Sequence, residues 1–125
     1  MKKIIATNQA PAAIGPYSQG VKTAGGLLFV SGQIPLVPST GELIAGGIEE
    51  QTTQVLENLQ AILSAAGFTL ADVVKTTVYL KDLSHFATVN SIYAKYFQQD
   101  CPARVCVEVS KLPKDALVEI DVVAG

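Results

Sequence analysis

A chain of 125 residues with 49% hydrophobic residues is long enough to bury one core, and we expect a single domain over residues 1–125. Its net charge of −2 and its pI near 5.2 argue against a nucleic-acid partner held by a basic patch. No apolar run approaches the roughly 18 residues that span a bilayer, and the apolar start at 4–6 ends too soon for a secretory signal. The sequence therefore predicts a cytoplasmic protein that makes no contact with a membrane.

The cysteines and the histidine give little support to a metal site or a disulfide. Cys101 and Cys106 lie close together in an extended segment, which is poor geometry for a disulfide. The single histidine, His85, begins a helix and is more often a surface residue there than a ligand. Without a second histidine or a Cys-x-x-Cys pair, we expect no metal constellation.

The N-terminal third predicts a short strand at 2–6, a loop rich in Pro and Gly, and a hairpin of strands at 18–22 and 27–32. Gly25 and Gly26 supply the positive φ that the tight hairpin turn needs. The apolar run at 27–30 predicts a strand that is covered on both faces.

Three residues of this region are candidates for a site, each with an ordinary structural alternative. Tyr17 ends the loop and offers a phenol there, or packs on the sheet edge. Ser31 offers a hydroxyl to a bound carboxylate, or satisfies a turn. Gly32 allows close backbone approach by a ligand, or by another strand.

The middle of the chain predicts two amphipathic helices separated by a strand. Apolar residues recur at helical spacing from Ile48 to Ala66, with Glu49 and Glu50 in the first turn. Residues 73–80 alternate as a strand, with Val74 expected on the same face as Thr76. A second helix, capped by Asp82 or Ser84, is expected to bury one set of residues: Phe86, Val89, Tyr93, Tyr96 and Phe97.

The last quarter alternates with period two in two further strands, which we expect to bury one face each. One expected buried face carries Val105, Val107 and Val109, so Arg104 lies on the other face with Cys106. An arginine offers a planar fork of donors that grips a carboxylate, and Glu119, between two apolar neighbours, is suited to proton transfer. The pair suggests a site for a small carboxylate, although an Arg and a Glu on a sheet are more often solvated or paired with each other.

The order strand, hairpin, helix, strand, helix, strand, strand predicts an α+β fold with one mixed sheet. Both helices are expected on the same face, which gives a two-layer sandwich. The uncovered face then holds apolar residues, and closed association of several chains is the expected way to cover it.

Five segments together resemble the RidA/YjgF family of reactive-imine deaminases. They are Ile-Gly-Pro-Tyr-Ser-Gln-Gly at 14–20, Ser-Gly-Gln-Ile-Pro at 31–35, Pro-Ala-Arg at 102–104, Leu-Pro-Lys at 112–114 and Val-Glu-Ile at 118–120. The segments are in the family's order and spacing, and the resemblance covers nearly the whole chain.

The resemblance implies a chorismate-mutase-like homotrimer with a central barrel and three clefts between subunits. It implies hydrolysis, without a cofactor, of the enamines and imines that pyridoxal-phosphate-dependent dehydratases release from serine or threonine. These are 2-aminoacrylate with 2-iminopropanoate, and 2-iminobutanoate, and the products are 2-keto acids and ammonia. Such a role belongs to the control of reactive metabolites in amino-acid metabolism.

Within this resemblance, Arg104 grips the substrate carboxylate and Glu119 positions or activates the attacking water. Tyr17, Ser31, Gly32 and Cys106 line the cleft, and Cys106 contributes backbone groups rather than its thiol. Two other classes of function stay open at this point. One is a regulatory trimer that binds keto acids without turnover, and the other is the inhibition of translation through RNA cleavage or a chaperone-like role.

Overall fold

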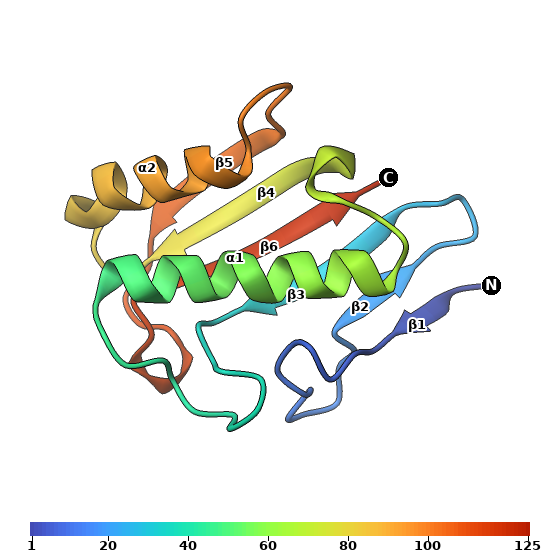
Figure 1. Ribbon diagram of the computed structural model, residues 1–125, viewed down its shortest axis with the longest axis horizontal. Coiled ribbons are helices and arrows are strands. Elements are labelled where there is room, and N and C mark those ends of the chain that lie inside the picture. Colours follow the sequence, from blue (N-terminus) through green and yellow to red (C-terminus); the bar gives the residue numbers. More distant parts are fainter.

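The computed structural model describes residues 1–125 as two helices packed on a six-stranded sheet (Figure 1). This confirms the predicted two-layer α+β architecture. The elements are β1 (Lys3–Ile5), β2 (Gly20–Lys22), β3 (Leu28–Gln33), α1 (Ile48–Ala65), β4 (Val73–Leu80), α2 (Phe86–Tyr96), β5 (Ala103–Glu108) and β6 (Val118–Ala124).

The sheet has the strand order β1-β2-β3-β6-β4-β5 and is mixed, as predicted. Only β4 and β5 run parallel, and the helix α2 makes the crossover connection between them. The last strand, β6, enters between β3 and β4 and pairs antiparallel with both. The chain therefore leaves β5 as one edge of the sheet.

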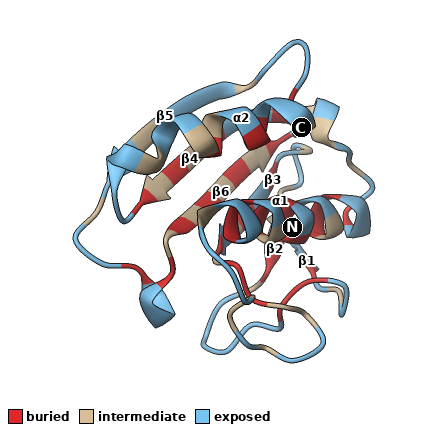
Figure 2. Ribbon diagram, turned by 60° about the vertical axis from the view of Figure 1, so that its left-hand side comes forward, coloured by how far each residue is buried: buried red, intermediate tan, exposed pale blue.

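Helix α1 follows from its apolar spacing and its ends. Its buried stripe packs on the sheet with 1% or less of each side chain exposed: Val55, Leu56, Leu59, Ile62 and Leu63. At its start, the carboxylate of Glu50 accepts a hydrogen bond from the backbone N–H of Gly47 at 2.9 Å. Gly67 follows the helix with a φ of +81°, which a residue with a side chain rarely adopts. Figure 2 shows buried residues on the inner side of this helix and along β4 and β6.

The predicted facing of β4 is wrong at its first two residues. Val73 is 4% exposed and faces the core, whereas Val74 is 47% exposed. The cause is an irregularity in the pairing with β6, where the register shifts between Val73 and Lys75. An extra residue of this kind turns one side chain to the opposite face. From Thr76 onward the alternation follows the prediction.

The second helix buries a narrower face than predicted. Val89, Tyr93 and Phe97 are buried, but Phe86 is exposed and Tyr96 only partly buried. Asp82 caps the short 3-10 turn Leu83–His85 before the helix by accepting a hydrogen bond from Ser84 N–H. Neither helix is long and apolar enough to cross a membrane.

The sheet face away from the helices is uncovered in the single chain. Phe29 of β3 is 47% exposed on this face, so the strand predicted to be covered on both faces is covered on one. On β5, Val105 and Val107 are also exposed, at 43% and 38%. The prediction that these valines face the core is wrong for the single chain, because α2 packs over the opposite face of β5.

Candidate functional site

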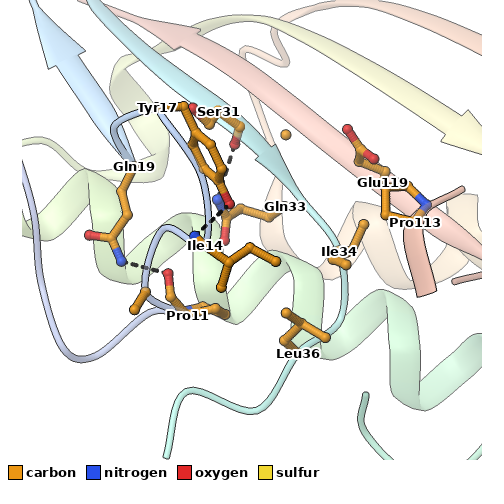
Figure 3. A pocket seen from close by; sticks show the side chains of 12 residues that line it. Pro11, Ile14, Tyr17, Gln19, Ser31, Gln33, Ile34, Leu36, Pro113 and Glu119 are labelled. Atoms are coloured by element: carbon orange, nitrogen blue, oxygen red, sulfur yellow. Dashed lines mark hydrogen bonds between the residues drawn. The ribbon is translucent and has the colours of Figure 1, made fainter. Parts of the chain in front are cut away.

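A pocket of about 410 Å³ opens where β3 leaves the sheet and β6 enters it. Twelve residues line it: Pro11, Ala12, Ile14, Tyr17, Gln19, Ser31, Gly32, Gln33, Ile34, Leu36, Pro113 and Glu119. Figure 3 shows the loop residues and β3 on one side of this pocket, with Glu119 and Pro113 on the other. Four of the six predicted site residues therefore meet here, namely Tyr17, Ser31, Gly32 and Glu119.

The loop wall of the pocket is fixed by Gln19, which the sequence did not single out. Its side-chain amide is buried and accepts a hydrogen bond from Thr7 N–H at 2.7 Å. The same amide donates to the carbonyls of Thr7 and Pro11, at 3.0 and 2.7 Å. These bonds satisfy backbone groups of an irregular loop that would otherwise lack partners. Gln19 thereby holds the start of the loop, while its own backbone carbonyl accepts a hydrogen bond from Ser31 N–H of β3 at 2.9 Å.

The hydroxyl groups of Ser31 and Tyr17, both in the pocket, differ in the hydrogen bonds that they already make within the chain. The Ser31 hydroxyl donates to the carbonyl of Ser18 at 2.6 Å, so its proton is already engaged and a ligand meets mainly its acceptor side. The Tyr17 hydroxyl accepts only a long contact of 3.4 Å from Ile14 N–H. Half of the Tyr17 side chain is exposed, and its phenol proton is available to a ligand.

Gly32 has no side chain because the carboxyl group of Glu119 occupies the space beside it. A Cβ atom at this position would lie 2.9 Å from Glu119 Cδ and would collide with Glu119 Oε2. The close approach predicted for Gly32 is therefore found, and its partner is a side chain of the site. The contact holds the Glu119 carboxyl at the pocket wall without a hydrogen bond from the protein.

Burial raises the pKa of the Glu119 carboxyl above its ordinary value, and the negative charge of Asp121 raises it further. A carboxyl group with a raised pKa is a better proton acceptor than an exposed one, and it keeps its own proton to a higher pH. The use of Glu119 in proton transfer stays a prediction, which its burial beside Asp121 favours.

Arg104 lies elsewhere in the single chain. Its guanidinium packs against α2, with Cζ 4.8 Å from the ring centre of Tyr93 and 5.5 Å from that of Phe86. Its Nη1 donates a hydrogen bond to Asn90 Oδ1 at 2.8 Å, and no other acceptor in the chain binds it. Asn90, also missed by the sequence analysis, holds one side of the guanidinium and leaves the remaining N–H groups for a ligand.

Cys106 shares the helix-covered face of β5 with Arg104 and is partly buried against the core. Burial raises the pKa of its thiol, and the nearby Arg104 opposes that effect only in part. A thiol that keeps its proton is a poor nucleophile, and a contribution of the Cys106 backbone to the cleft stays a prediction.

The single chain does not bring Arg104 and Glu119 together. Arg104 pairs with Thr76, which faces the helices, whereas Glu119 pairs with Tyr79, which faces away from them. The two residues also sit on strands separated by β4, a distance of about 10 Å across the sheet. A site that uses both side chains is therefore not formed within one chain.

Comparison with known proteins gives one consistent result. A family model described as Endoribonuclease L-PSP matches residues 7–125. The 2-iminobutanoate/2-iminopropanoate deaminase of Escherichia coli K12 is 52% identical over 127 residues, covering 99% of this chain and 98% of that protein. A RutC family protein of Pyrococcus horikoshii is 59% identical over 124 residues, with coverage of 99% and 98%. A crystal structure of E. coli TdcF with bound serine superposes with a TM-score of 0.92 at 47% identity, covering 98% of this chain and 97% of that one.

Proposed function

The chain belongs to the RidA/YjgF family, and from this premise we propose that it hydrolyses 2-imino acids to 2-keto acids and ammonia. The substrates are the short imines 2-iminopropanoate and 2-iminobutanoate together with their enamine forms. The enzyme name of the E. coli relative supports this class of substrate. The observation that carries the proposal is the Glu119 carboxyl, held beside Gly32 in a pocket, with a raised pKa and no hydrogen-bond partner.

Arg104 of a neighbouring chain completes the site in this proposal. The exposed apolar residues of the open sheet face, Phe29, Val105 and Val107, favour its burial in a closed assembly, which we take to be the homotrimer typical of the family. The free N–H groups of Arg104 then grip the substrate carboxylate at a cleft between two subunits. The serine bound in the TdcF structure is a ligand with such a carboxylate.

The chemistry needs few groups, because the carbon of a protonated imine is already electrophilic. Arg104 fixes the carboxylate, so that the imine carbon faces the pocket of the neighbouring chain. Glu119 accepts a proton as the water oxygen bonds to that carbon, which gives a tetrahedral carbinolamine. Glu119 then gives this proton to the nitrogen, and as the C–N bond breaks it takes the proton of the carbinolamine hydroxyl, so that a 2-keto acid and ammonia form. The departing ammonia takes that proton from Glu119, so one protonated imine and one water give one keto acid and one ammonium ion.

The direct test couples a threonine or serine dehydratase to keto-acid formation in the presence of semicarbazide, which traps free imine. Added wild-type protein is expected to hasten keto-acid release and to reduce the trapped fraction. The double variant that lacks both Arg104 and Glu119 is the control for non-specific effects of added protein. An unchanged trapped fraction with wild-type protein contradicts the proposal for these substrates.

Mixing two inactive variants tests whether the site lies between chains. Arg104→Ala and Glu119→Gln chains, unfolded and reassembled together, are expected to regain about a quarter of the wild-type rate. The reason is that every mixed trimer contains one cleft in which both residues are intact, and about three quarters of randomly assembled trimers are mixed.

Native mass spectrometry of the same sample establishes that mixed assemblies have formed. Each variant reassembled alone is the matched control and is expected to stay inactive. If mixed trimers are present and activity is not regained, Arg104 and Glu119 do not act across one interface.

Binding of a keto acid without turnover is the second candidate function. The pocket and the free N–H groups of Arg104 can bind a ligand that carries a carboxylate even if no water attacks that ligand. Calorimetry with 2-oxobutanoate separates the two functions: binding together with an unchanged trapped fraction favours the binder. The acidic composition of the chain gives no such support to the RNA cleavage that the family description names.

A further inference from the structure

A second carboxylate lies beside Glu119 on the open face of the sheet. Glu119 and Asp121 are two residues apart on β6 and point to the same side. On the neighbouring strand β4, Tyr79 stands directly opposite Glu119, and Thr77 stands opposite Asp121. The Tyr79 hydroxyl reaches diagonally and donates a hydrogen bond to Asp121 Oδ2 at 2.9 Å.

This hydrogen bond fixes Asp121 rather than leaving it free to turn into solvent. Tyr79 and Asp121 are both partly buried, and neither is exposed as a surface pair would be. Hydrogen bonding to Asp121 is the largest cause that raises the pKa of the Tyr79 phenol, so the phenol keeps its proton and goes on donating. The raised pKa of the phenol therefore favours the form of Tyr79 that donates to Asp121.

Within one chain, no cation forms an ion pair with either carboxylate, and in the proposed function the cation that faces Glu119 is Arg104 of a neighbouring chain. The one ion pair in the structure joins Lys111 and Asp115, both highly exposed. Around Glu119, β6 contributes Asp121, β4 contributes Tyr79, and the loop across the pocket contributes Tyr17. The other neighbouring strand, β3, brings Gly32 against Glu119, and its Ser31 and Gln33 line the same pocket, as does Pro113 from the turn before β6. Lys75 is exposed on the same face of β4, where it pairs with Val123, two residues along the strand from Thr77 and four from Tyr79.

We propose that Tyr79 and Asp121 are positioning residues for Glu119. The Tyr79 hydroxyl holds the negative charge of Asp121 beside the Glu119 carboxyl, and this charge helps Glu119 to keep a proton available for the leaving nitrogen. The inference rests on the proposed deaminase function and adds to it. Neither Tyr79 nor Asp121 touches the substrate in this scheme. They act through Glu119, the group that handles the proton.

The direction of the effect follows from the signs of the charges. A negative neighbour makes ionisation of Glu119 less favourable, and Asp121 is such a neighbour. Asp121→Asn keeps the size and the hydrogen-bond acceptor but removes the charge. Glu119 then loses its proton more easily, so the pKa of its carboxyl falls both in the free enzyme and in the complex with substrate.

The test is the dependence of kcat/KM on pH for wild type, Asp121→Asn, Tyr79→Phe and Glu119→Gln. The limb that Glu119→Gln abolishes is the one assigned to Glu119. This limb is expected to move to lower pH in Asp121→Asn, and in the same direction but less in Tyr79→Phe, with KM almost unchanged. Glu49→Gln removes the same charge from the exposed face of α1 and is expected to leave the limb in place.

A second measurement does not depend on activity. Titration of the side-chain carboxyls by ¹³C NMR reports the midpoint of Glu119 directly, with Glu119→Gln to assign its resonance. A lower midpoint in Asp121→Asn supports the proposal even if the imines tested are not substrates. An unchanged midpoint in Asp121→Asn, with the assembly size unchanged by sedimentation, overturns it whether or not the protein proves to be a deaminase.

Discussion

Replacing Arg104 with alanine is expected to lower kcat/KM for 2-imino acids about a hundredfold or more, as loss of a charged partner at a desolvated contact usually costs several kcal/mol. Arg104 is the only arginine of the chain, so in the proposed cleft between subunits its guanidinium is the one group that offers several parallel N–H donors to a carboxylate, and Asn90 engages only one of them. The loss is expected in both KM and kcat, because the carboxylate contact also aims the imine carbon at the catalytic water. Steady-state kinetics with enzymatically generated imine measures it.

Arg104→Lys is the matched control for charge. Lysine keeps the positive charge but not the planar fork, nor the packing over Tyr93 and Phe86, so a loss between wild type and alanine is expected. Asn90→Ala leaves Arg104 in place without its anchor, and its KM is expected to rise while the pH profile keeps its shape. Wild-type kinetics in Arg104→Ala, at an unchanged assembly size, would remove this residue from the site.

Glu119→Gln is expected to lower kcat by roughly two to four orders of magnitude, the usual range for the loss of a general acid–base group. Glutamine keeps the shape that packs against Gly32, so the pocket should stay intact. Binding of the product keto acid is expected to persist or to tighten, because a negative charge near the ligand carboxylate is removed. Single-turnover rates and calorimetry separate these two effects.

The same substitution carries a prediction about stability. Because folding raises the pKa of Glu119, protonated Glu119 favours the folded state and ionised Glu119 opposes it. The stability from this group is present below the unfolded pKa and is lost as pH rises through the folded pKa. In an Arg104→Ala background, where no guanidinium faces the carboxyl, Glu119→Gln is expected to raise Tm at neutral pH and to leave it unchanged in acid. A Tm difference independent of pH would contradict the assignment.

The sequence predicted the elements well because their periodicity is strong. The apolar stripe of α1 fits only one buried face, and the alternation of β6 puts Glu119 on the side opposite Val118 and Ile120. The alternation of β5 does not decide its facing, because Val105 and Val107 on one side and Cys106 on the other are all apolar. Which side α2 covers depends on packing across the whole chain, and that packing put Arg104 against the helix.

The relation between Arg104 and Glu119 is another feature that no local pattern contains. It depends on β6 entering the sheet between β3 and β4, which puts β4 between the two strands that carry these residues. The roles of Asn90 and Gln19 were not predicted for the same reason. The side chain of each forms a hydrogen bond with a residue that is not its neighbour in sequence. The displaced facing of Val74 arises from one irregular pairing, for which Val73–Leu80 carries no glycine or proline signal.

The contact between Gly32 and Glu119 also restricts how this protein can change by mutation. Any side chain at position 32 displaces the carboxyl, and a shorter acid at position 119 leaves a void beside the glycine. Each single substitution is therefore harmful. Alanine at position 32 combined with aspartate at position 119 relieves the collision, because the shorter side chain moves the carboxyl group away from the new Cβ atom. The two positions are expected to show strong epistasis, so routes to a new substrate range that alter this wall of the pocket require paired changes.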